Sequence, residues 1–200
     1  LVIVVPYLIP ILEKAGAVVF TPRERDWQTE EVIVDNDGPK RNYFEGTAQG
    51  KWQKTPYAGF AWHTGTYSDG ENPFEAGSAR MAKTTNSKSR YSVATYQPDF
   101  KKSGRYAVYV SYQTLPNSID DALYTVWHKG ERTQFHVNQQ MGGGTWVYLG
   151  TFDFDAGYSE FNRVTVTNQS NRHGVVTTDA IRFGGGMGNI ERFGETSGMP

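Results

Sequence analysis

The chain has 200 residues, with 20 basic and 21 acidic side chains and a formal net charge of −1. Neither sign is clustered, which argues against a nucleic-acid-binding protein because phosphate binding requires a basic stripe. The absence of cysteine excludes a disulfide scaffold and thiolate metal sites. This length suits one domain with a fragment attached, or one large sandwich.

The first 26 residues have a pattern unlike that of the rest. Residues 5–15 predict a helix, Gly16 is placed to cap its C-terminus, and residues 17–20 predict a short buried strand. The apolar segment 1–20 contains charged residues and prolines and has no basic flank ahead of it, so we predict no membrane span. Because the first residue is not Met, we expect a fragment or a processed product.

The middle of the chain alternates apolar and polar residues. In 104–110 this period-2 pattern is typical of a half-buried strand. Two further alternating runs lie on either side of Lys129-Gly130-Glu131, which predicts a β-hairpin. The fold class is therefore mainly β, an antiparallel, jelly-roll-like β-sandwich of seven to nine strands. The other expected strands are 31–34, 89–96, 163–167 and 175–183, and 54–86 is expected to be rich in loops.

Ordered blocks between Val32 and Phe183 carry a family resemblance. The blocks are Asp35-Asn36-Asp37 with Phe44 and Trp52, then 104–110, 124–128, 137–139, 146–152 and 179–183. Together they resemble the golvesin C-terminal-like domain, also described as a xanthan-lyase-type, carbohydrate-binding-like domain. The resemblance implies a β-sandwich appended to or inserted in extracytoplasmic enzymes, and therefore a secreted or periplasmic location.

A second resemblance covers the N-terminal piece. Residues 12–26 resemble the helix and second strand of a zinc N-acetylmuramoyl-L-alanine amidase, through Gly16-Ala17 and a strand followed by Thr21-x-Arg23-x-x-Asp26. This resemblance implies an amidase-like fragment at 1–26, the sandwich at 27–184, and a Gly-rich tail at 185–200 that re-enters the amidase-like domain. None of that family's zinc-binding residues maps onto this chain. We therefore expect no catalytic residues and no cofactor here, and zinc only in a parent hydrolase.

Metal sites within the sandwich are not favoured by the sequence. The histidines share no metal-ligand spacing. His128 and His136 flank the expected hairpin, so we expect them to face each other as a cross-strand polar pair, in preference to a metal site. Asp35 and Asp37 suggest a calcium loop, but the third ligand and the terminal Glu of that motif are missing, so a turn is preferred. The four histidines are His63, His128, His136 and His173.

Ligand contacts are expected in the aromatic loop 56–74. Sugar rings stack on exposed aromatic side chains, and polar neighbours complete the hydrogen bonding. The candidate residues are Tyr57, Trp62, Tyr67, Asp69 and Asn72. The alternative is that such aromatics, Phe60 among them, hold the loop through a satellite cluster. Trp146 is expected in the core, and Asp179 is expected to bind buried polar groups. Asn168-Gln169-Ser170 fits an N-glycosylation sequon.

These observations lead to one preferred function and two alternatives. The preferred one is a non-catalytic module of a secreted, amidase-like cell-wall protein that binds polysaccharide or peptidoglycan. The first alternative is a purely structural domain that orients the parent enzyme and has no glycan ligand. The second, an intrinsic glycosidase or lyase activity, is the least favoured because no paired carboxylates at suitable spacing stand out.

Overall fold

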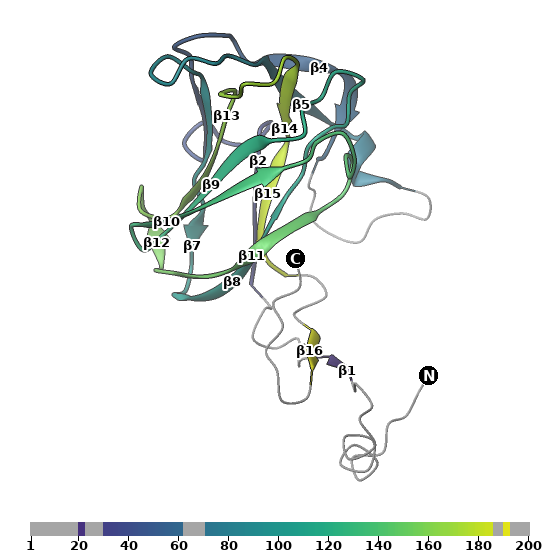
Figure 1. Ribbon diagram of the computed structural model, residues 1–200. Coiled ribbons are helices and arrows are strands. Elements are labelled where there is room, and N and C mark those ends of the chain that lie inside the picture. The colour runs from purple at the N-terminus through teal and green to yellow at the C-terminus, as the bar shows by residue number, and fades with distance from the viewer. Residues whose placement is uncertain (1–19, 23–29, 62–70, 186–189, 193–200) are drawn as a thin grey trace.

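The computed structural model describes residues 20–22, 30–61, 71–185 and 190–192 of the chain. Apart from one short 3₁₀ turn, the regular secondary structure in these ranges is β-strand (Figure 1). The strands are β1 (Phe20–Pro22), β2 (Glu31–Asp35), β3 (Tyr43–Gly46), β4 (Gln53–Gly59), β5 (Gly77–Lys83), β6 (Val93–Tyr96), β7 (Asp99–Phe100), β8 (Gly104–Val110), β9 (Ala122–His128), β10 (Glu131–Val137), β11 (Val147–Phe154), β12 (Gly157–Tyr158), β13 (Arg163–Thr167), β14 (Val175–Thr178), β15 (Ala180–Gly184) and β16 (Ile190–Arg192), and η3 (Pro73–Glu75) is a 3₁₀ turn.

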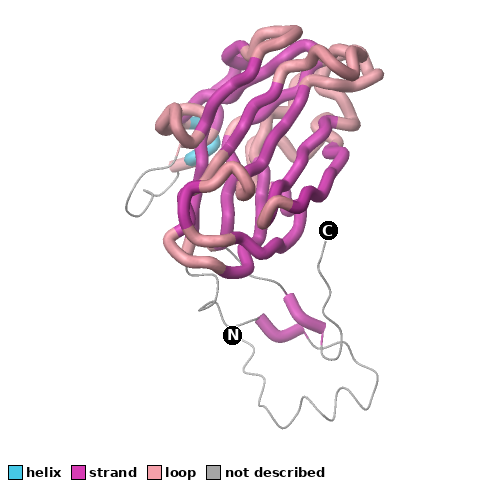
Figure 2. Tube along the Cα trace, turned by 90° about the vertical axis from the view of Figure 1, so that its left-hand side faces the viewer, coloured by secondary structure: helices cyan, strands magenta, loops and turns pink. Residues whose placement is uncertain are grey.

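Two sheets form the sandwich. One has five strands in the order β10-β9-β13-β6-β3, and the other has four in the order β11-β8-β15-β2. All their strand pairs are antiparallel, and Figure 2 shows the strands running roughly side by side, joined by loops at their ends. A smaller three-stranded sheet, β14-β5-β4, lies at one end. The mainly β, antiparallel sandwich expected from the sequence is confirmed, while the expected helix at 5–15 lies outside the described residues.

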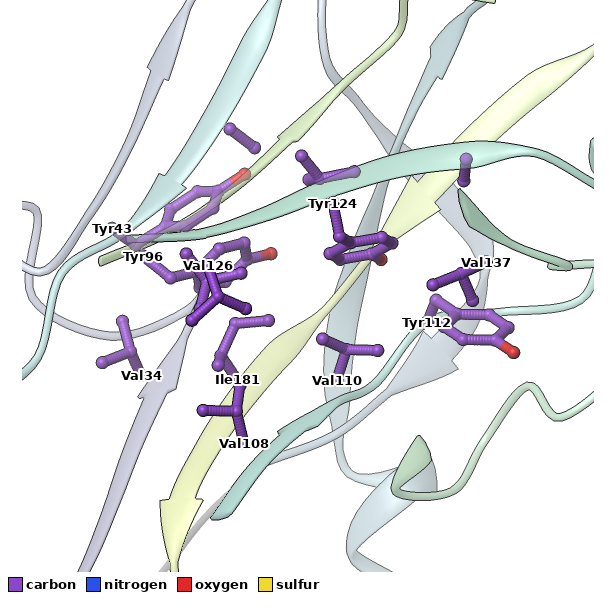
Figure 3. Packing of buried hydrophobic residues seen from close by; sticks show 14 of the residues in the cluster. Val34, Tyr43, Tyr96, Val108, Val110, Tyr112, Tyr124, Val126, Val137 and Ile181 are labelled. Atoms are coloured by element: carbon purple, nitrogen blue, oxygen red, sulfur yellow. The ribbon is translucent and has the colours of Figure 1, made fainter. Parts of the chain in front are cut away.

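The core lies between the two sheets. Tyr124 and Val126 come from the five-stranded sheet and meet Val108 and Ile181 from the four-stranded sheet (Figure 3). All four are fully buried, and burying such a side chain contributes about 1.5–3 kcal/mol. The alternation seen in the sequence therefore has its expected cause, because every second residue of a strand points to the same face.

The hairpin β9–β10 has a two-residue turn at Lys129 and Gly130. Their φ angles of 52° and 83° are both positive, as a type I′ turn requires. This tight turn sets the register, so that His128 lies opposite Glu131 and His136 lies opposite Leu123. The expected facing pair of His128 and His136 is therefore wrong: the two residues sit at opposite ends of the hairpin.

The expected strand 175–183 is broken in two at Asp179. β14 pairs with β5, while β15 pairs with β2 and β8, so the chain changes sheets at this residue. The Asp179 carboxylate accepts a hydrogen bond from the Phe60 backbone N–H at 2.9 Å, as the expected buried polar role requires. No Gly or Pro marks the break in the sequence, because the break depends on a partner far away in the chain.

The region 54–86, expected to be rich in loops, contains the strands β4 and β5. Both are poor in β-branched residues, and β4 contains Pro56 and Gly59, so their sequence lacks a strand signal. β4 tolerates proline because it is the edge strand of the three-stranded sheet and Pro cannot donate to a ladder.

The two ends of the sandwich leave it side by side. β2 begins and β15 ends at the paired residues Glu31 and Gly184. Beyond them, β1 and β16 pair with each other antiparallel, with Phe20 opposite Arg192, and Figure 1 shows this small sheet outside the sandwich.

Candidate functional site

A groove with a volume of about 430 Å³ lies on the outer face of the three-stranded sheet. Ala82 of β5 belongs to the core, so its neighbours Met81 and Lys83 point to the opposite, outer face. Met81 pairs with Gln53 of β4, and Lys83 pairs with Val175 of β14. The groove therefore has a floor of all three strands, with Tyr57 and the loop 115–117 among its other lining residues.

Tyr57 stands out from β4 because the strand is irregular there. The register with β5 shifts between Lys54 and Ala58, and the Thr55 hydroxyl donates to the Tyr57 carbonyl oxygen at 3.0 Å. Such a bulge re-aims a side chain and is tolerated at a sheet edge. As a result the Tyr57 side chain is 60% exposed and lines the groove.

The loop 115–117 is held by its own hydrogen bonds. The Ser118 N–H donates to the Leu115 carbonyl at 3.0 Å, and the Leu115 N–H donates to the Ser118 hydroxyl at 2.9 Å. The Val175 N–H donates to the Asn117 carbonyl at 2.9 Å, which ties the loop to β14. This part of the groove is therefore preformed, and a ligand would not have to order it.

Asn168 joins the two backbone segments that carry Lys51 and Lys83, two lysines that line the groove. Its Nδ2 donates to the carbonyls of Gln49, at 3.0 Å, and Lys83, at 2.7 Å, and its Oδ1 accepts from the Ser92 N–H at 2.7 Å. The residue is only 1% exposed. The sequon at Asn168 is therefore a buried structural amide in the folded chain and not an accessible glycosylation site.

Gly50 allows the close approach of these segments. Its φ of 85° lies in the left-handed region that favours glycine. A Cβ at this position would lie 2.8 Å from Nδ2 of Asn168. The groove is thus shaped at this point by the lack of a side chain.

The predicted ligand residues do not come together. Tyr57 lies in the groove, whereas Asn72 caps η3, with its Oδ1 accepting from the Phe74 N–H at 3.1 Å and its Nδ2 donating to Glu75 at 3.0 Å. Trp62, Tyr67 and Asp69 lie outside the described residues. The groove is also lined by Lys51, Gln53, Lys83 and Asn117, which were not predicted, since isolated polar residues on separate strands and loops carry no local signal.

The sequence predicted Trp146 in the core, and this is wrong. The residue is half-buried and packs against η3. Its ring centroid lies 4.9 Å from that of Phe60 and 5.6 Å from that of Phe74, and the Arg182 guanidinium lies 5.9 Å from its ring. We call Phe60, Phe74 and Trp146 the aromatic cluster. Phe60 thus belongs to a small aromatic cluster outside the main core, as the alternative to a ligand contact predicted.

Two carboxyl groups lie close to each other, because the half-buried Asp35 pairs with Ala180, the residue after the buried Asp179. Burial raises the pKa of Asp35 to about 7, and burial raises the pKa of Asp179 to about 8, with a further rise from the charges of Asp35 and Asp37. The residues 35–39 form a turn, as expected, in which the Asp37 N–H donates to Asp35 Oδ1 at 2.7 Å. The two Asp37 oxygens are taken by the N–H and hydroxyl of Ser78, at 2.7 and 2.6 Å.

The described ranges contain no group of three or more His, Cys, Asp or Glu side chains arranged to hold a metal ion. They also contain no helix of the length and apolar character needed to cross a membrane.

Comparison with protein families decides the identity of the sandwich. The model of the Golvesin C-terminal domain matches residues 32–185, which span the strands from β2 to β15. The chain belongs to the Golvesin C-terminal domain family.

The relatives of this Golvesin C-terminal domain include much longer proteins. It is 29% identical to the xanthan lyase of Bacillus sp. (strain GL1) over 60% of the chain and 13% of that protein. The solved Paenibacillus xanthan lyase matches 77% of the chain and 13% of its own length, at 25% identity and a TM-score of 0.58. The C-terminal CBM6 of the laminarinase LamC from Zobellia galactanivorans matches 78% of the chain at 15% identity, and its TM-score of 0.46 supports no inference about this chain.

Proposed function

We propose that this Golvesin C-terminal domain is a non-catalytic, glycan-binding module and that the groove beside Tyr57 is its binding site. The observation that carries the proposal is an aromatic ring, 60% exposed, at a preformed groove that also has amide side chains. A pyranose ring stacks its C–H face on such an aromatic, and amides hydrogen-bond its hydroxyls, as in small-molecule sites generally. Gln53 and Asn117 are exposed and supply those amides.

The relatives support this proposal. Two of the proteins that this chain resembles are named for their action on xanthan, so related domains occur in carbohydrate-active enzymes. The chain spans only 13% of each of them, and their activity is not carried over to it. We place the domain outside the cytoplasm, secreted or periplasmic, with polysaccharide or peptidoglycan as the ligand class.

The parent protein is proposed to be an amidase-like enzyme of the cell wall into which the sandwich is inserted. The pairing of β1 with β16 supports an insertion, because the two flanking pieces form one small sheet of their own. The resemblance of residues 12–26 supports the amidase identity. Zinc ligands of such an enzyme would lie outside this chain, so no hydrolytic step is assigned to the residues described.

The test is binding of the 200-residue chain to immobilised polysaccharides and peptidoglycan, compared with Tyr57→Ala and Phe161→Ala. Phe161 is a matched control, because it is 59% exposed and does not line the groove. We expect Tyr57→Ala to weaken binding by about tenfold or more, as loss of a stacking anchor does, and Phe161→Ala to leave it unchanged. Equal affinities of all three proteins would rule out the groove as the binding site. No binding to any glycan would favour the purely structural role, in which the domain orients the parent enzyme.

A further inference from the structure

We propose that the groove selects glycans that carry anionic substituents, such as uronic acid carboxylates or sulfate esters. The inference rests on the proposed function and names the ligand class of the same site. Two lysines, Lys51 and Lys83, line the groove, and no acidic residue does. Both side chains are exposed, and neither has an ion-pair partner within the described residues.

Two other hollows of the molecule show that this charge pattern is not general. The hollow beside His128 combines Arg105 and Lys129 with Glu131 and Asp153. The hollow beside Phe44 likewise combines Lys40 and Arg80 with Asp37 and Glu45, and its Arg80 and Glu45 form an ion pair at 2.7 Å. In both, the cations have carboxylates beside them, whereas the lysines of the Tyr57 groove face none.

The two lysines are held by fixed backbone. Lys83 is the last residue of β5 and pairs with Val175, and its carbonyl is bonded to Asn168. The same Asn168 side chain bonds the Gln49 carbonyl, two residues before Lys51, on the far side of Gly50. The buried amide thus fixes the spacing of the two cationic segments, although the lysine side chains themselves remain free to follow a ligand.

A ligand that fits these groups has a neutral and a charged part. The exposed ring of Tyr57 offers a stacking surface for the face of one sugar. The two ammonium groups would form charge-assisted hydrogen bonds to an anionic substituent on that sugar or its neighbour, and such bonds are stronger than neutral ones. Lysine acts as a point charge without the geometry of a bidentate fork, so carboxylate and sulfate share the recognition chemistry.

The experiment compares matched polymers on the intact chain. Biolayer interferometry would use immobilised polygalacturonate, the same polymer after carboxyl reduction to a neutral galactan, dextran sulfate, and unmodified dextran. The variants are Lys51→Gln, Lys83→Gln and their combination. The control is Lys54→Gln, which removes an exposed lysine of β4 that does not line the groove.

We expect binding to polygalacturonate, to dextran sulfate or to both, and weak or no binding to the two neutral polymers. Each groove variant should weaken binding about two- to fivefold, and the double variant about tenfold, the range for exposed ion pairs. Lys54→Gln should leave binding unchanged, and added salt should weaken it by screening. Which anionic polymer binds distinguishes carboxylate from sulfate as the source of the charge.

Three results would overturn the inference, and they differ in what they say about the proposed function. Preferential binding to the neutral polymers, lost in Tyr57→Ala, would remove anion selection and leave a glycan-binding groove. An equal loss in Lys54→Gln and the groove variants would show general charge attraction and not a site. If the chain binds none of the polymers and no peptidoglycan, both the proposed function and the inference fail.

Discussion

Tyr57 and Phe60 are three positions apart on and just after β4, yet they have opposite surroundings. Phe60 is 2% exposed and packs in the aromatic cluster, whereas Tyr57 is 60% exposed beside the groove. The difference comes from distant partners. Trp146 packs against Phe60, and Asp179 accepts a hydrogen bond from its backbone N–H, while the Tyr57 side chain is left exposed. An aromatic residue on or near β4 is therefore buried or exposed according to what lies across from it.

The largest effect is expected for Phe60→Ala. Truncating a fully buried phenylalanine removes its transfer free energy and leaves a cavity, which costs about 3–5 kcal/mol. The free energy of unfolding, measured with urea, should fall by this amount. A loss of less than about 1 kcal/mol would show that the aromatic cluster does not support the sandwich, and the contrast with Tyr57 would disappear.

The carboxyl groups of Asp35 and Asp179 are expected to make stability dependent on pH. Burial raises the pKa of Asp35 and Asp179 from 3.8 to about 7 and about 8, so the folded chain holds protons that the unfolded chain releases. Their contribution is complete below pH 3.8 and is lost as the pH rises towards 8. We expect the chain to be less stable at pH 9 than at pH 5, because the protons that favour the folded state are lost over this interval.

Asp179→Asn tests the source of this dependence. The variant keeps an oxygen that can accept from the Phe60 N–H but cannot ionise, so its loss of stability between pH 5 and pH 9 should be smaller than that of the wild type. Identical pH profiles, measured by urea unfolding at each pH, would show that Asp179 does not titrate in this window.

Trp146→Ala is expected to have a smaller effect than Phe60→Ala. Trp146 is only half-buried, so part of its surface is already in water and less transfer free energy is lost. We expect a loss of about 2 kcal/mol, measured in the same unfolding experiment. A cost equal to that of Phe60→Ala would instead mean that Trp146 contributes to stability as a core residue does, although it is only half-buried.

Tyr57→Ala should change stability least, by less than about 0.5 kcal/mol, as is usual for surface positions. Tyr57→Phe is the control, because it keeps the ring and removes only the hydroxyl. If Tyr57→Ala costs as much as Trp146→Ala, the ring supports the fold, and its exposure is not a sign of a ligand site.

Local sequence determined much of the β-structure. The alternation in β8 and β9, and the Lys129-Gly130 turn, are properties of neighbouring residues, and the ordered blocks were enough to indicate the Golvesin C-terminal domain family. Tyr57 was also named from the sequence, because an aromatic in a Pro- and Gly-rich segment is a local feature; it lines the groove, and its contact with a ligand stays a prediction.

Tertiary structure alone decided the rest. The break between β14 and β15 depends on Asp179 reaching the Phe60 N–H, 119 positions away. The groove depends on Asn168 joining the segments of Lys51 and Lys83, and on a loop fixed to β14. Pairing of distant segments leaves no periodic trace in the sequence, since each segment satisfies its own local rules equally well in other arrangements. For that reason the chain itself indicated the sandwich and one aromatic of the site, but not the lysines that give the groove its charge.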